Sequence, residues 1–438
     1  MSPTILFLGL PPKTFVGINL VSFNSSPNFL GITNVPKGLL FLYTGTDAFL
    51  SIRHGLWLNI RPTSTSTEII TLTWNNDLEH LEQVDAGSTQ SQEITRRLPE
   101  LQKKGLVDFA ALRDASANLQ NEQSDHQSNR DGQNSGNIWP ALTSHVTSRL
   151  LTRVLSSKDR DKSSTKWALT SVSAAPSDTE HIPGLTSMES RLALEPLRTL
   201  NLMPMDLKQT WPEDAVGRSR TEMARDRSWY LKHLISHLTM PDVAHEGGEG
   251  EVSQSKAASE LLGELQFCFL MVLCLANYSC LEQWKRLLTV LFTCRSALTE
   301  VEGFFVEVLK VVRQQLGRVD DVEGGLFELS DESSSAWLRK LLKTFRATVE
   351  EVYADAADSG GSKEEGKNVR KVLDELEKWL GEKYGWEDEK NTLRRGMVQL
   401  EDGEMVELQA DDLDEDEETG EYAPVVVETG LAYSGSLD

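Results

Sequence analysis

The sequence predicts an α+β multidomain chain with a β-sandwich-like N-terminal domain, an all-α helical domain and an acidic, disordered C-terminal tail. Three observations predict this order. Short apolar runs separated by turn residues occupy the first 74 positions, a central stretch at 263–295 is apolar on nearly every face of its first half, and no lysine or arginine follows Arg395. We therefore expect four segments: a β-rich domain over 1–84 that extends to about 155 if linker helices join it, a polar linker region over 85–182, a helical domain over 183–383 and a tail over 384–438.

The N-terminal domain is predicted from strands that alternate with turns. Gly, Pro, Asn and Ser separate five short apolar runs, which are Ile5–Leu8, Phe15–Leu20, Leu39–Tyr43, Leu56–Ile60 and Ile69–Trp74. Regularly spaced strands with turn signals are typical of a sandwich or a barrel-like sheet. Between two of these runs, Asn34–Gly38 has the composition of a turn, because Pro36 presets φ and Gly38 permits a positive φ.

The linker region is predicted to hold two helices within polar sequence. Leu98–Leu119 carries apolar residues at helical spacing. A second helix is expected at 141–155, where an apolar residue recurs every four positions, at Leu142, Val146, Leu150 and Val154. The runs 120–136 and 156–180 are strongly polar or rich in Ser and Thr, so we expect loop or disorder there.

The helical domain is predicted from a succession of apolar stripes. The fully apolar half of the central stretch ends at Asn277 and is too short for the ~20 residues of a membrane span. We expect it at the centre of the domain, followed by an antiparallel amphipathic helix. Further helices are expected over Arg218–Leu238, Thr299–Leu316, Ala336–Tyr353 and Lys367–Leu380, with Thr299 and Glu302 at capping-box spacing. Consecutive helices with short connections indicate a bundle or a superhelix.

Composition excludes several classes of protein. The chain has 438 residues and a formal net charge of −23, which opposes contact with phosphate backbones and suits a partner with a basic surface. The four cysteines, at 268, 274, 280 and 294, lack the paired spacing of a zinc site, so we expect buried thiols. The first residues lack the basic region of a signal peptide. We expect a soluble intracellular protein that contacts neither nucleic acid nor membrane directly.

The sequence contains no catalytic constellation that we recognise. A phosphate-binding loop, a dinucleotide-binding glycine motif, a nucleophile elbow and an HExxH zinc motif are all absent from it. His233 and His237 lie four apart on a predicted helix and offer two metal ligands, but no third ligand has a matching spacing, so plain surface residues are the simpler interpretation. Alternating Asp412, Asp414 and Asp416 lack the glycine and the helices of a calcium loop. We predict no enzyme, no metal site and no cofactor.

Several stretches together resemble a known family. Gly263-Glu-Leu-Gln-Phe with Glu282-Gln-Trp-Lys-Arg-Leu-Leu resembles the signature of the AAR-type splicing factors, which are assembly factors of the U-five small nuclear ribonucleoprotein. Trp139-Pro-Ala-Leu-Thr-Ser-His-Val-Thr is similar to the family's tryptophan-to-LTSHIT segment. The N-terminal runs between Phe7 and Leu42 resemble its opening strands, and Gln315-Leu-Gly lies where the family has a QLGE-like turn. The matches follow the family order over about 5–74, 138–155 and 221–316.

The resemblance implies a β-sandwich-like domain joined to a helical domain similar to a VHS superhelix. It also implies a non-enzymatic assembly chaperone in pre-mRNA splicing. Such a factor binds the large central scaffold protein of the spliceosome through that protein's RNase-H-like and Jab/MPN-like domains, and delays its engagement with helicase and RNA. We accordingly expect a monomer before binding, present in cytoplasm and nucleus. The alternatives are a VHS-like peptide-binding adaptor in trafficking and a hydrolase with an unrecognised site.

Six residues are the predicted partner-binding positions. Trp284, Lys285 and Arg286 are the most suggestive cluster, although a helix with a buried tryptophan and a charged solvent face explains them equally well. Val425, Val426 and Val427 form a β-prone segment after the acidic run, which we expect to add as a strand to a sheet edge on the partner. An unpaired tail is the alternative. The chain departs from the family in its polar 83–137 region, its long Ser/Thr-rich linker and its extension beyond residue 367.

Overall fold

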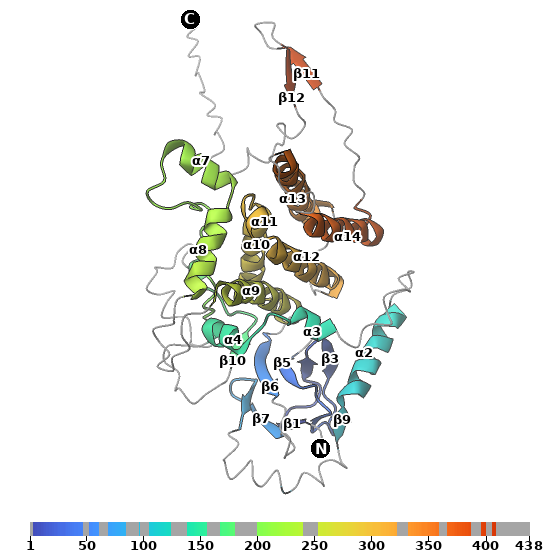
Figure 1. Cartoon of the computed structure of the whole chain (residues 1–438). Helices are drawn as coiled ribbons and strands as arrows, with labels where there is room; N and C mark the ends of the chain where they lie inside the picture. Colours follow the sequence, from blue (N-terminus) through green and yellow to red (C-terminus); the bar gives the residue numbers. More distant parts are fainter. Residues whose placement is uncertain are drawn as a thin grey trace, which may run out of the picture. The chain divides into compact units, whose positions relative to one another are not determined.

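The computed structural model describes residues 3–46, 52–60, 69–84, 96, 105–123, 138–155, 167–179, 199–239, 253–321, 332–358, 366–386, 396–399 and 405–408. Residues 1–378 form one compact unit, and residues 379–438 form a second. The first unit contains a sheet-rich N-terminal region and a helical C-terminal region (Figure 1). The predicted α+β organisation is confirmed at this level.

The N-terminal region contains two five-stranded sheets, with strand orders β8-β7-β1-β4-β9 and β10-β6-β5-β2-β3. The strands are β1 (Thr4–Leu8), β2 (Phe15–Ile18), β3 (Val21–Asn24), β4 (Gly31–Thr33), β5 (Gly38–Gly45), β6 (His54–Ile60), β7 (Ile69–Asn75), β8 (His80–Gln83), β9 (Leu106–Asp108) and β10 (Trp167–Thr170). In the first sheet β1 pairs antiparallel with β4 and parallel with β7, so this sheet is mixed. In the second sheet every pairing is antiparallel. The five predicted strands correspond to β1, β2, β5, β6 and β7.

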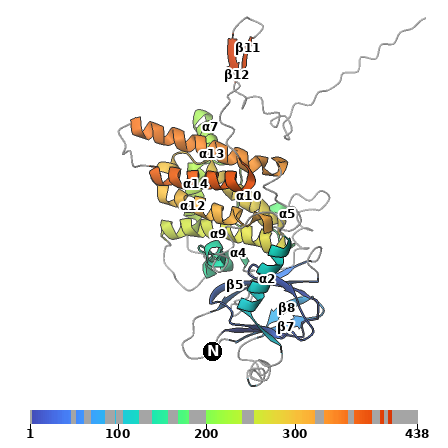
Figure 2. The ribbon, with the colours of Figure 1, turned by 90° about the vertical axis from the view of Figure 1, so that its right-hand side faces the viewer.

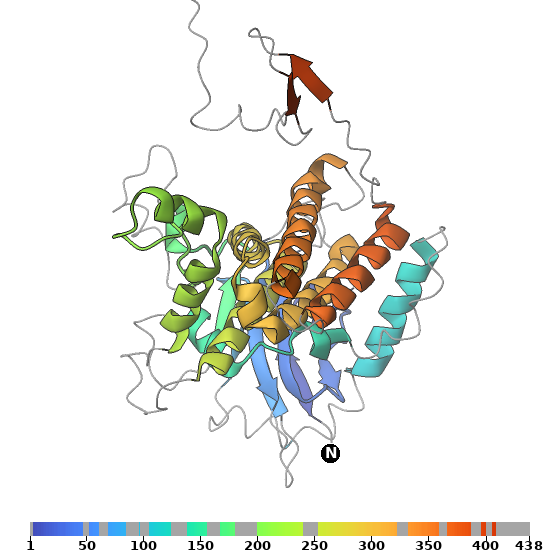
Figure 3. The ribbon, with the colours of Figure 1, turned by 45° about the horizontal axis from the view of Figure 1, so that its top comes forward.

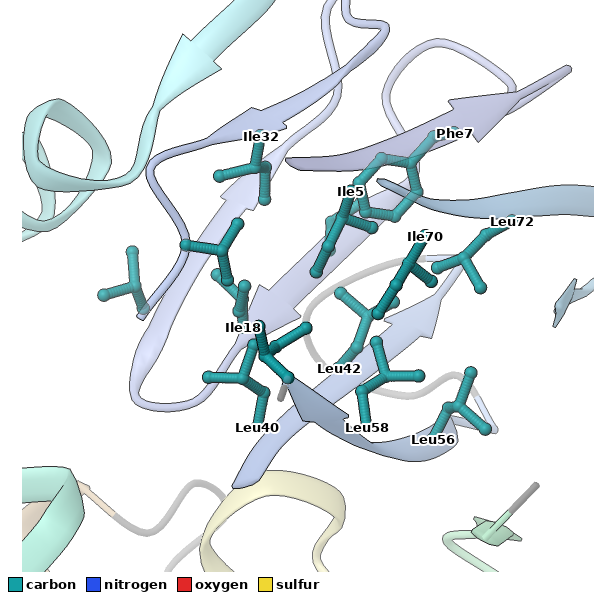
Figure 4. Close-up of a cluster of buried hydrophobic side chains, with 14 of the residues drawn as sticks. Ile5, Phe7, Ile18, Ile32, Leu40, Leu42, Leu56, Leu58, Ile70 and Leu72 are labelled. Atoms are coloured by element: carbon teal, nitrogen blue, oxygen red, sulfur yellow. The ribbon is translucent and has the colours of Figure 1, made fainter. Parts of the chain in front are cut away.

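The two sheets share one hydrophobic core (Figure 4). Both contribute its labelled residues, which are Ile5, Phe7, Ile32, Ile70 and Leu72 from the first sheet and Ile18, Leu40, Leu42, Leu56 and Leu58 from the second. The alternate positions of the second sheet are buried as well, including Phe41 and Trp57. Since a sheet covered on both faces needs apolar residues at nearly every position, β5 and β6 read as continuous apolar runs.

The helices are α2 (Phe109–Gln123), α3 (Ile138–Leu142), α4 (Ser148–Leu155), α5 (Pro176–Thr179), α7 (Gly217–Arg225), α8 (Ser228–Thr239), α9 (Gln254–Leu275), α10 (Tyr278–Phe292), α11 (Ala297–Glu300), α12 (Glu302–Leu316), η3 (Val319–Asp321), α13 (Glu332–Asp358) and α14 (Lys367–Tyr384). Helix α9 packs against α8, α10 and α12, and α10 packs against α13 (Figures 1 and 2). Helix α2 packs against β3 and β9, on the opposite side of this unit from α7 and α8 (Figure 3).

Helix α9 is the centre of the helical region, as the sequence predicts. With 22 residues it is longer than the apolar half of the central stretch, and by length and composition alone it qualifies as a candidate membrane span. However, 89% of its apolar window is buried inside the fold. Phe267 of α9 stacks on Trp57 of β6 with ring centroids 6.2 Å apart, so the helix lies directly on the second sheet. Its apolar faces are thus covered by protein.

Three predicted helices are corrected by the structure. The helix predicted over 98–119 begins only at Phe109, because residues 106–108 pair with β4 as strand β9. The helix predicted at 141–155 is two helices, since Thr147 accepts a hydrogen bond at Oγ1 from the N–H of Leu150 and so caps a new start for α4. The helix predicted over 218–238 breaks at Asp226, whose carboxylate accepts from the N–H of Ser228 at the start of α8.

The predicted capping box is also wrong. Thr299 lies inside α11, and its hydroxyl donates to the carbonyl of Ser296 at 3.1 Å. Helix α12 begins at Glu302 after Val301, which makes no side-chain cap. A short separate helix therefore occupies the residues where the spacing indicated a cap.

Part of the segment expected to be disordered is ordered. Residues 167–170 of the Ser/Thr-rich run form β10, which pairs antiparallel with β6 at the edge of the second sheet, and residues 176–179 form α5. Trp167 and Leu169 are buried in this strand. A two-residue apolar alternation in a polar run was too weak a signal to predict a strand, but it is sufficient when β6 supplies the pairing partner.

The second unit contains a hairpin of β11 (Gly396–Gln399) and β12 (Met405–Leu408), paired antiparallel. The sequence analysis did not predict it. The acidic run at 411–418 and the predicted strand at Val425, Val426 and Val427 lie outside the described residues.

Candidate functional site

The stretches that carry the family resemblance meet in the buried junction between the sheets and the helices. Gln266 of α9 accepts a hydrogen bond at Oε1 from the N–H of His145 at 2.8 Å. Its Nε2 donates to the carbonyl of Ala141 and to the hydroxyl of Ser144, both at 3.0 Å. A single buried side chain therefore pairs with three groups of the α3–α4 segment and fixes the position of that segment on α9.

Gly263 permits the close approach of the same segment. A Cβ atom at this position would lie 2.3 Å from the carbonyl oxygen of His145, a distance that real Cβ contacts do not show. A mid-helix glycine costs about 1 kcal/mol relative to alanine. Here the backbone contact between α9 and residue 145 explains why glycine occupies the position.

A buried ion cluster joins α4, α9 and α10. Arg153 lies 2.8 Å from Glu260 and 2.7 Å from Glu264, and Glu264 also accepts from the N–H of Met203 and the Nε2 of Gln283, both at 2.9 Å. Burial by itself would lower the pKa of Arg153, but the two carboxylates outweigh burial and raise that pKa above its ordinary value. The guanidinium therefore stays charged, and every group in the cluster has a partner.

Trp284 belongs to the core of the helical region in this structure. Its side chain is 2% exposed, and its Nε1 donates to Oε1 of Gln315 at 2.9 Å. The Nε2 of Gln315 donates in turn to the carbonyl of Leu265 at 3.1 Å. These bonds connect α10 to α12 and α9. The sequence left two interpretations of Trp284 open, a core residue or a partner-binding residue, and in this structure the side chain lies in the core.

The two charged neighbours of Trp284 lie at the surface of α10. Lys285 pairs with Glu282 one turn earlier at 3.3 Å. Arg286 pairs with Asp178 of α5 at 2.9 Å and is partly buried. The cluster predicted as one site is therefore divided between core and surface.

A set of stacked aromatic rings continues the junction into the sheets. Trp57 of β6 lies between Trp139 of α3, at 5.8 Å, and Phe267 of α9, at 6.2 Å between ring centroids. The indole N–H of Trp139 donates to the carbonyl of Leu39 in β5 at 2.8 Å. The tryptophan segment of the resemblance thus connects the second sheet to the helices.

Asn277 completes the junction where α9 turns into α10. Its Oδ1 accepts from the N–H of Cys280 at 2.9 Å and caps α10. Its Nδ2 donates to the carbonyls of Thr170, Ser171 and Ser173, at 3.2, 3.1 and 2.7 Å. Asn277 is fully buried, so it fixes the β10–α5 segment onto the α9–α10 turn.

Comparison with known protein families identifies the two parts of the chain that contribute to the junction. A family model described as the AAR2 N-terminal domain matches residues 1–156, and one described as the AAR2 C-terminal repeat region matches residues 202–389. The chain belongs to the AAR2 family. The resemblance to AAR-type splicing-related assembly factors is thereby confirmed, and neither family model describes an enzyme. The N-terminal model covers strands β1 to β9 and the α3–α4 segment of the junction, and the C-terminal model covers α9 and α10.

Curated members of the AAR2 family align along most of the chain. The chain is similar to the protein named AAR2 homolog from Mus musculus, with 23% identity over 390 residues, covering 88% of this chain and 89% of the mouse protein. The Homo sapiens protein of the same name shows 22% identity over 398 residues, with the same coverage. The rabbit protein, from Oryctolagus cuniculus, shows 22% identity over 385 residues and 88% coverage of each chain.

The junction of this AAR2 family member has the properties of a structural element. Gln266, Glu264, Gln283, Gln315 and Asn277 are buried and hydrogen-bonded within the fold. Among the described residues no group of three or more His, Cys, Asp or Glu is arranged to hold a metal ion. The four cysteines are free and buried, and burial raises the pKa of the Cys268 and Cys294 thiols well above their ordinary value. Neutral, enclosed thiols are poor nucleophiles.

A hollow of about 250 Å³ lies between the two sheets at their β8 and β10 edges. Its lining is mainly apolar, from Leu42, Leu56, Leu81 and Leu169, with two stacked histidines, His54 and His80, at 5.4 Å between centroids. Thr44 and Thr170 also line it, and both are cross-strand partners of His54.

An exposed apolar patch lies at the outer edge of the junction. The exposed large hydrophobic side chains of the described residues are Ile52, Leu78, Val172, Val216, Tyr278 and Val301. Three of them, Ile52, Val172 and Tyr278, belong to segments that the junction holds together, and we call these three the junction patch. Tyr278 is 64% exposed although it directly follows the buried Asn277.

Hydrogen bonds connect the chain neighbours of the three patch residues. The N–H of Ser171 donates to the carbonyl of Arg53 at 2.9 Å, just beyond the last β10–β6 pair, and Val172 and Ile52 are the chain neighbours of these two bonded residues. Asn277 donates to the carbonyl of Ser171 at 3.1 Å, which brings the first residue of α10, Tyr278, to the same point. The sequence analysis missed this patch because its members are more than 100 positions apart and one lies in the Ser/Thr-rich run.

Proposed function

We propose that this AAR2 family member is a non-enzymatic assembly chaperone in pre-mRNA splicing. In this proposal it binds the large central scaffold protein of the spliceosome, through that protein's RNase-H-like and Jab/MPN-like domains, during biogenesis of the U-five small nuclear ribonucleoprotein. Binding would delay engagement of helicase and RNA, and the protein would be present in cytoplasm and nucleus. The observation that carries the proposal is the match of both AAR2 models, in order, over 1–156 and 202–389.

The buried junction supports a role in holding a large partner in a set geometry. The sheets and the helices of the first unit are connected through Gln266 and Asn277, which are buried, and Arg153, which is partly buried; each has several partners. A preorganised surface loses little conformational entropy on binding, and this favours a stable complex. We extend the proposal to a VHS-like architecture for the helical region, whose packing around α9 is compatible with a helical superhelix.

The junction patch is the surface that we assign to the scaffold protein. Its three side chains are exposed and apolar, each adjoins a hydrogen-bonded junction residue in the chain, and one is a tyrosine, a residue enriched among those that dominate binding energies. Single exposed apolar residues need no explanation, but a cluster on one surface is typical of an interaction site. In this account Trp284 supports the surface from within, and Lys285 and Arg286 lie beside it on α10.

The negative charge of the chain fits a partner that otherwise binds RNA. A formal net charge of −23 repels phosphate and attracts a basic protein surface, so occupancy of that surface excludes RNA. We therefore propose that the partner contacts the chain through a basic face and that association slows as salt rises.

The test is calorimetry and gel filtration of the full chain with the purified RNase-H-like and Jab/MPN-like domains. Tyr278→Ala, alone or with Val172→Ala, should weaken binding to the scaffold by about tenfold or more, because hot-spot truncations cost on the order of 2 kcal/mol. Leu78→Ala is the matched control, since Leu78 is similarly exposed in the β7–β8 turn.

Two further outcomes separate the parts of this proposal. A chain ending at Arg395 that no longer retains the Jab/MPN-like domain would support the strand-adding tail at 425–427, whereas full retention would remove that tail from the proposal. A well-folded full chain that binds neither scaffold domain would refute the assembly role and favour the peptide-binding adaptor.

A further inference from the structure

His233 and His237 form a pair on the exposed face of α8 that the proposed function does not use. The two residues are one helical turn apart, and their Nε2 atoms lie 3.2 Å from each other. The rings are nearly perpendicular, with an interplanar angle of 87° and 4.6 Å between centroids. The two imidazoles thus share one Nε2···Nε2 hydrogen bond, and both belong to α8 (Figure 1).

The separation of these nitrogens matches the spacing of two ligands on one metal ion. Zinc–imidazole bonds are about 2.0–2.1 Å long. Two such bonds at angles between 90° and the tetrahedral value place their nitrogens about 2.9–3.4 Å apart. The observed 3.2 Å lies within that interval, and a bound ion would replace the proton that the two Nε2 atoms share in the metal-free chain.

Neighbouring rings hold one of the imidazoles in place. The indole of Trp229 stacks on His233 with 5.0 Å between centroids and an interplanar angle of 11°. The phenol ring of Tyr230 lies 6.4 Å from the same imidazole. Because the ligand orientation is set by contacts that do not involve a metal, little rotamer entropy is lost when an ion binds.

A second histidine pair of the chain shows what a structural contact looks like. His54 and His80 are stacked nearly in parallel, at 20° and 5.4 Å between centroids, and His80 lies 3.4 Å from the carboxylate of Glu82. Parallel rings at this distance do not direct their nitrogens at a shared point. This pair therefore serves as a matched control.

We propose that His233 and His237 form a bidentate surface site for a late divalent transition ion, such as Zn²⁺, Ni²⁺ or Cu²⁺. Among the described residues no group of three or more metal-binding side chains exists, so the remaining coordination positions are open to water or to a side chain of a bound partner. Bound metal would connect two successive turns of α8.

The test uses Cu²⁺ as a spectroscopic probe and Zn²⁺ in calorimetry, on the full chain. One equivalent of Cu²⁺ should give an electron paramagnetic resonance spectrum with superhyperfine coupling to two imidazole nitrogens. His233→Ala and His237→Ala should each remove that pattern and weaken Zn²⁺ binding on the order of tenfold or more, since the second ligand acts at a high effective concentration. His80→Ala should change neither readout. The order of affinity should place Cu²⁺ above Ni²⁺ and Zn²⁺.

A second readout distinguishes copper bound by the histidine pair from copper bound elsewhere on this acidic chain. Copper bound by the pair should quench the fluorescence of Trp229, so Trp229→Phe should remove most of the copper-dependent quenching while it preserves the two-nitrogen spectrum. Both histidines are exposed, and circular dichroism of the variants should match the wild type. A one-nitrogen or oxygen-only spectrum, or a two-nitrogen spectrum that survives in the His233→Ala and His237→Ala double variant, would overturn the proposal.

Discussion

Asn277→Ala tests the junction most sharply, because one small side chain there connects three elements. The substitution removes the cap of α10 and both N–H donors that serve the carbonyls of Thr170, Ser171 and Ser173. It leaves the backbone of the α9–α10 turn free to keep its conformation, since Ala276 carries the left-handed φ of 54°. The expected effect is therefore on stability and on the ordering of β10.

The magnitude follows from the bonds that are lost. Loss of an N-cap costs about 1 kcal/mol. A buried carbonyl without a donor costs about 1–3 kcal/mol, and two donors here serve three carbonyls. We expect Asn277→Ala to lower the free energy of unfolding by about 3–5 kcal/mol, a large share of the ~5–15 kcal/mol of a typical domain.

The assay is urea unfolding followed by circular dichroism, with Asn59→Ala as the control. Asn59 is exposed and donates one 3.3 Å bond to Ser148, so its removal should cost less than about 0.5 kcal/mol. Asn277→Asp keeps the acceptor for Cys280 but replaces the donors with a charge facing three carbonyls, and it should be at least as unstable as the alanine variant at neutral pH. An Asn277→Ala protein as stable as Asn59→Ala would refute the assignment of Asn277 as a junction residue.

Three other substitutions test the remaining contacts. Trp284→Phe keeps an aromatic ring in the core but leaves Gln315 without its donor, so the free energy of unfolding should fall by about 1–3 kcal/mol. Trp284→Ala should lower it by about 3–5 kcal/mol. Thermal melts distinguish the two variants. Arg153→Met leaves the fully buried Glu264 without its cation and should cost about 3–5 kcal/mol, against less than about 1 kcal/mol for the more exposed Arg149→Met, measured by urea titration. Burial would raise the pKa of Asp226, but hydrogen bonds from Ser228, the N–H of Arg295 and Ser296 outweigh it and hold that pKa below its ordinary value. The stabilisation by the Asp226 carboxylate is thus complete above about pH 4 and is lost as pH falls through the lowered pKa. Asp226→Asn should therefore flatten the acid limb of a curve of unfolding free energy against pH. An unchanged acid limb would contradict this.

The parts of the fold that the sequence predicted are those whose signal is local. The strands β5 and β6 are apolar at almost every position because both faces of their sheet are covered, and α9 is apolar around its whole circumference for the same reason. Strand β8, with the sequence His-Leu-Glu-Gln, carries no such signal, since it lies at a sheet edge and is only partly buried. Its pairing with β7 decides its conformation.

The junction could be predicted only in part for a related physical reason. The resemblance identified Gln266, Trp284 and Gln315 as notable residues, yet their partners lie between 31 and 125 positions away. A hydrogen bond between distant residues depends on how the elements pack, which periodicity and local spacing do not describe. The histidine pair is the opposite case, because a four-residue spacing on one helix is local and predicts that the rings meet.

Hydrogen–deuterium exchange on the chain alone and in complex with the scaffold's RNase-H-like and Jab/MPN-like domains tests the central claim most directly. The account predicts new protection in the segments around Ile52, Val172 and Tyr278, which form the junction patch. It predicts no change in α9 from Leu261 to Leu275, where the amides are already enclosed. Complex formation with protection confined to surfaces away from these three segments would contradict the claim.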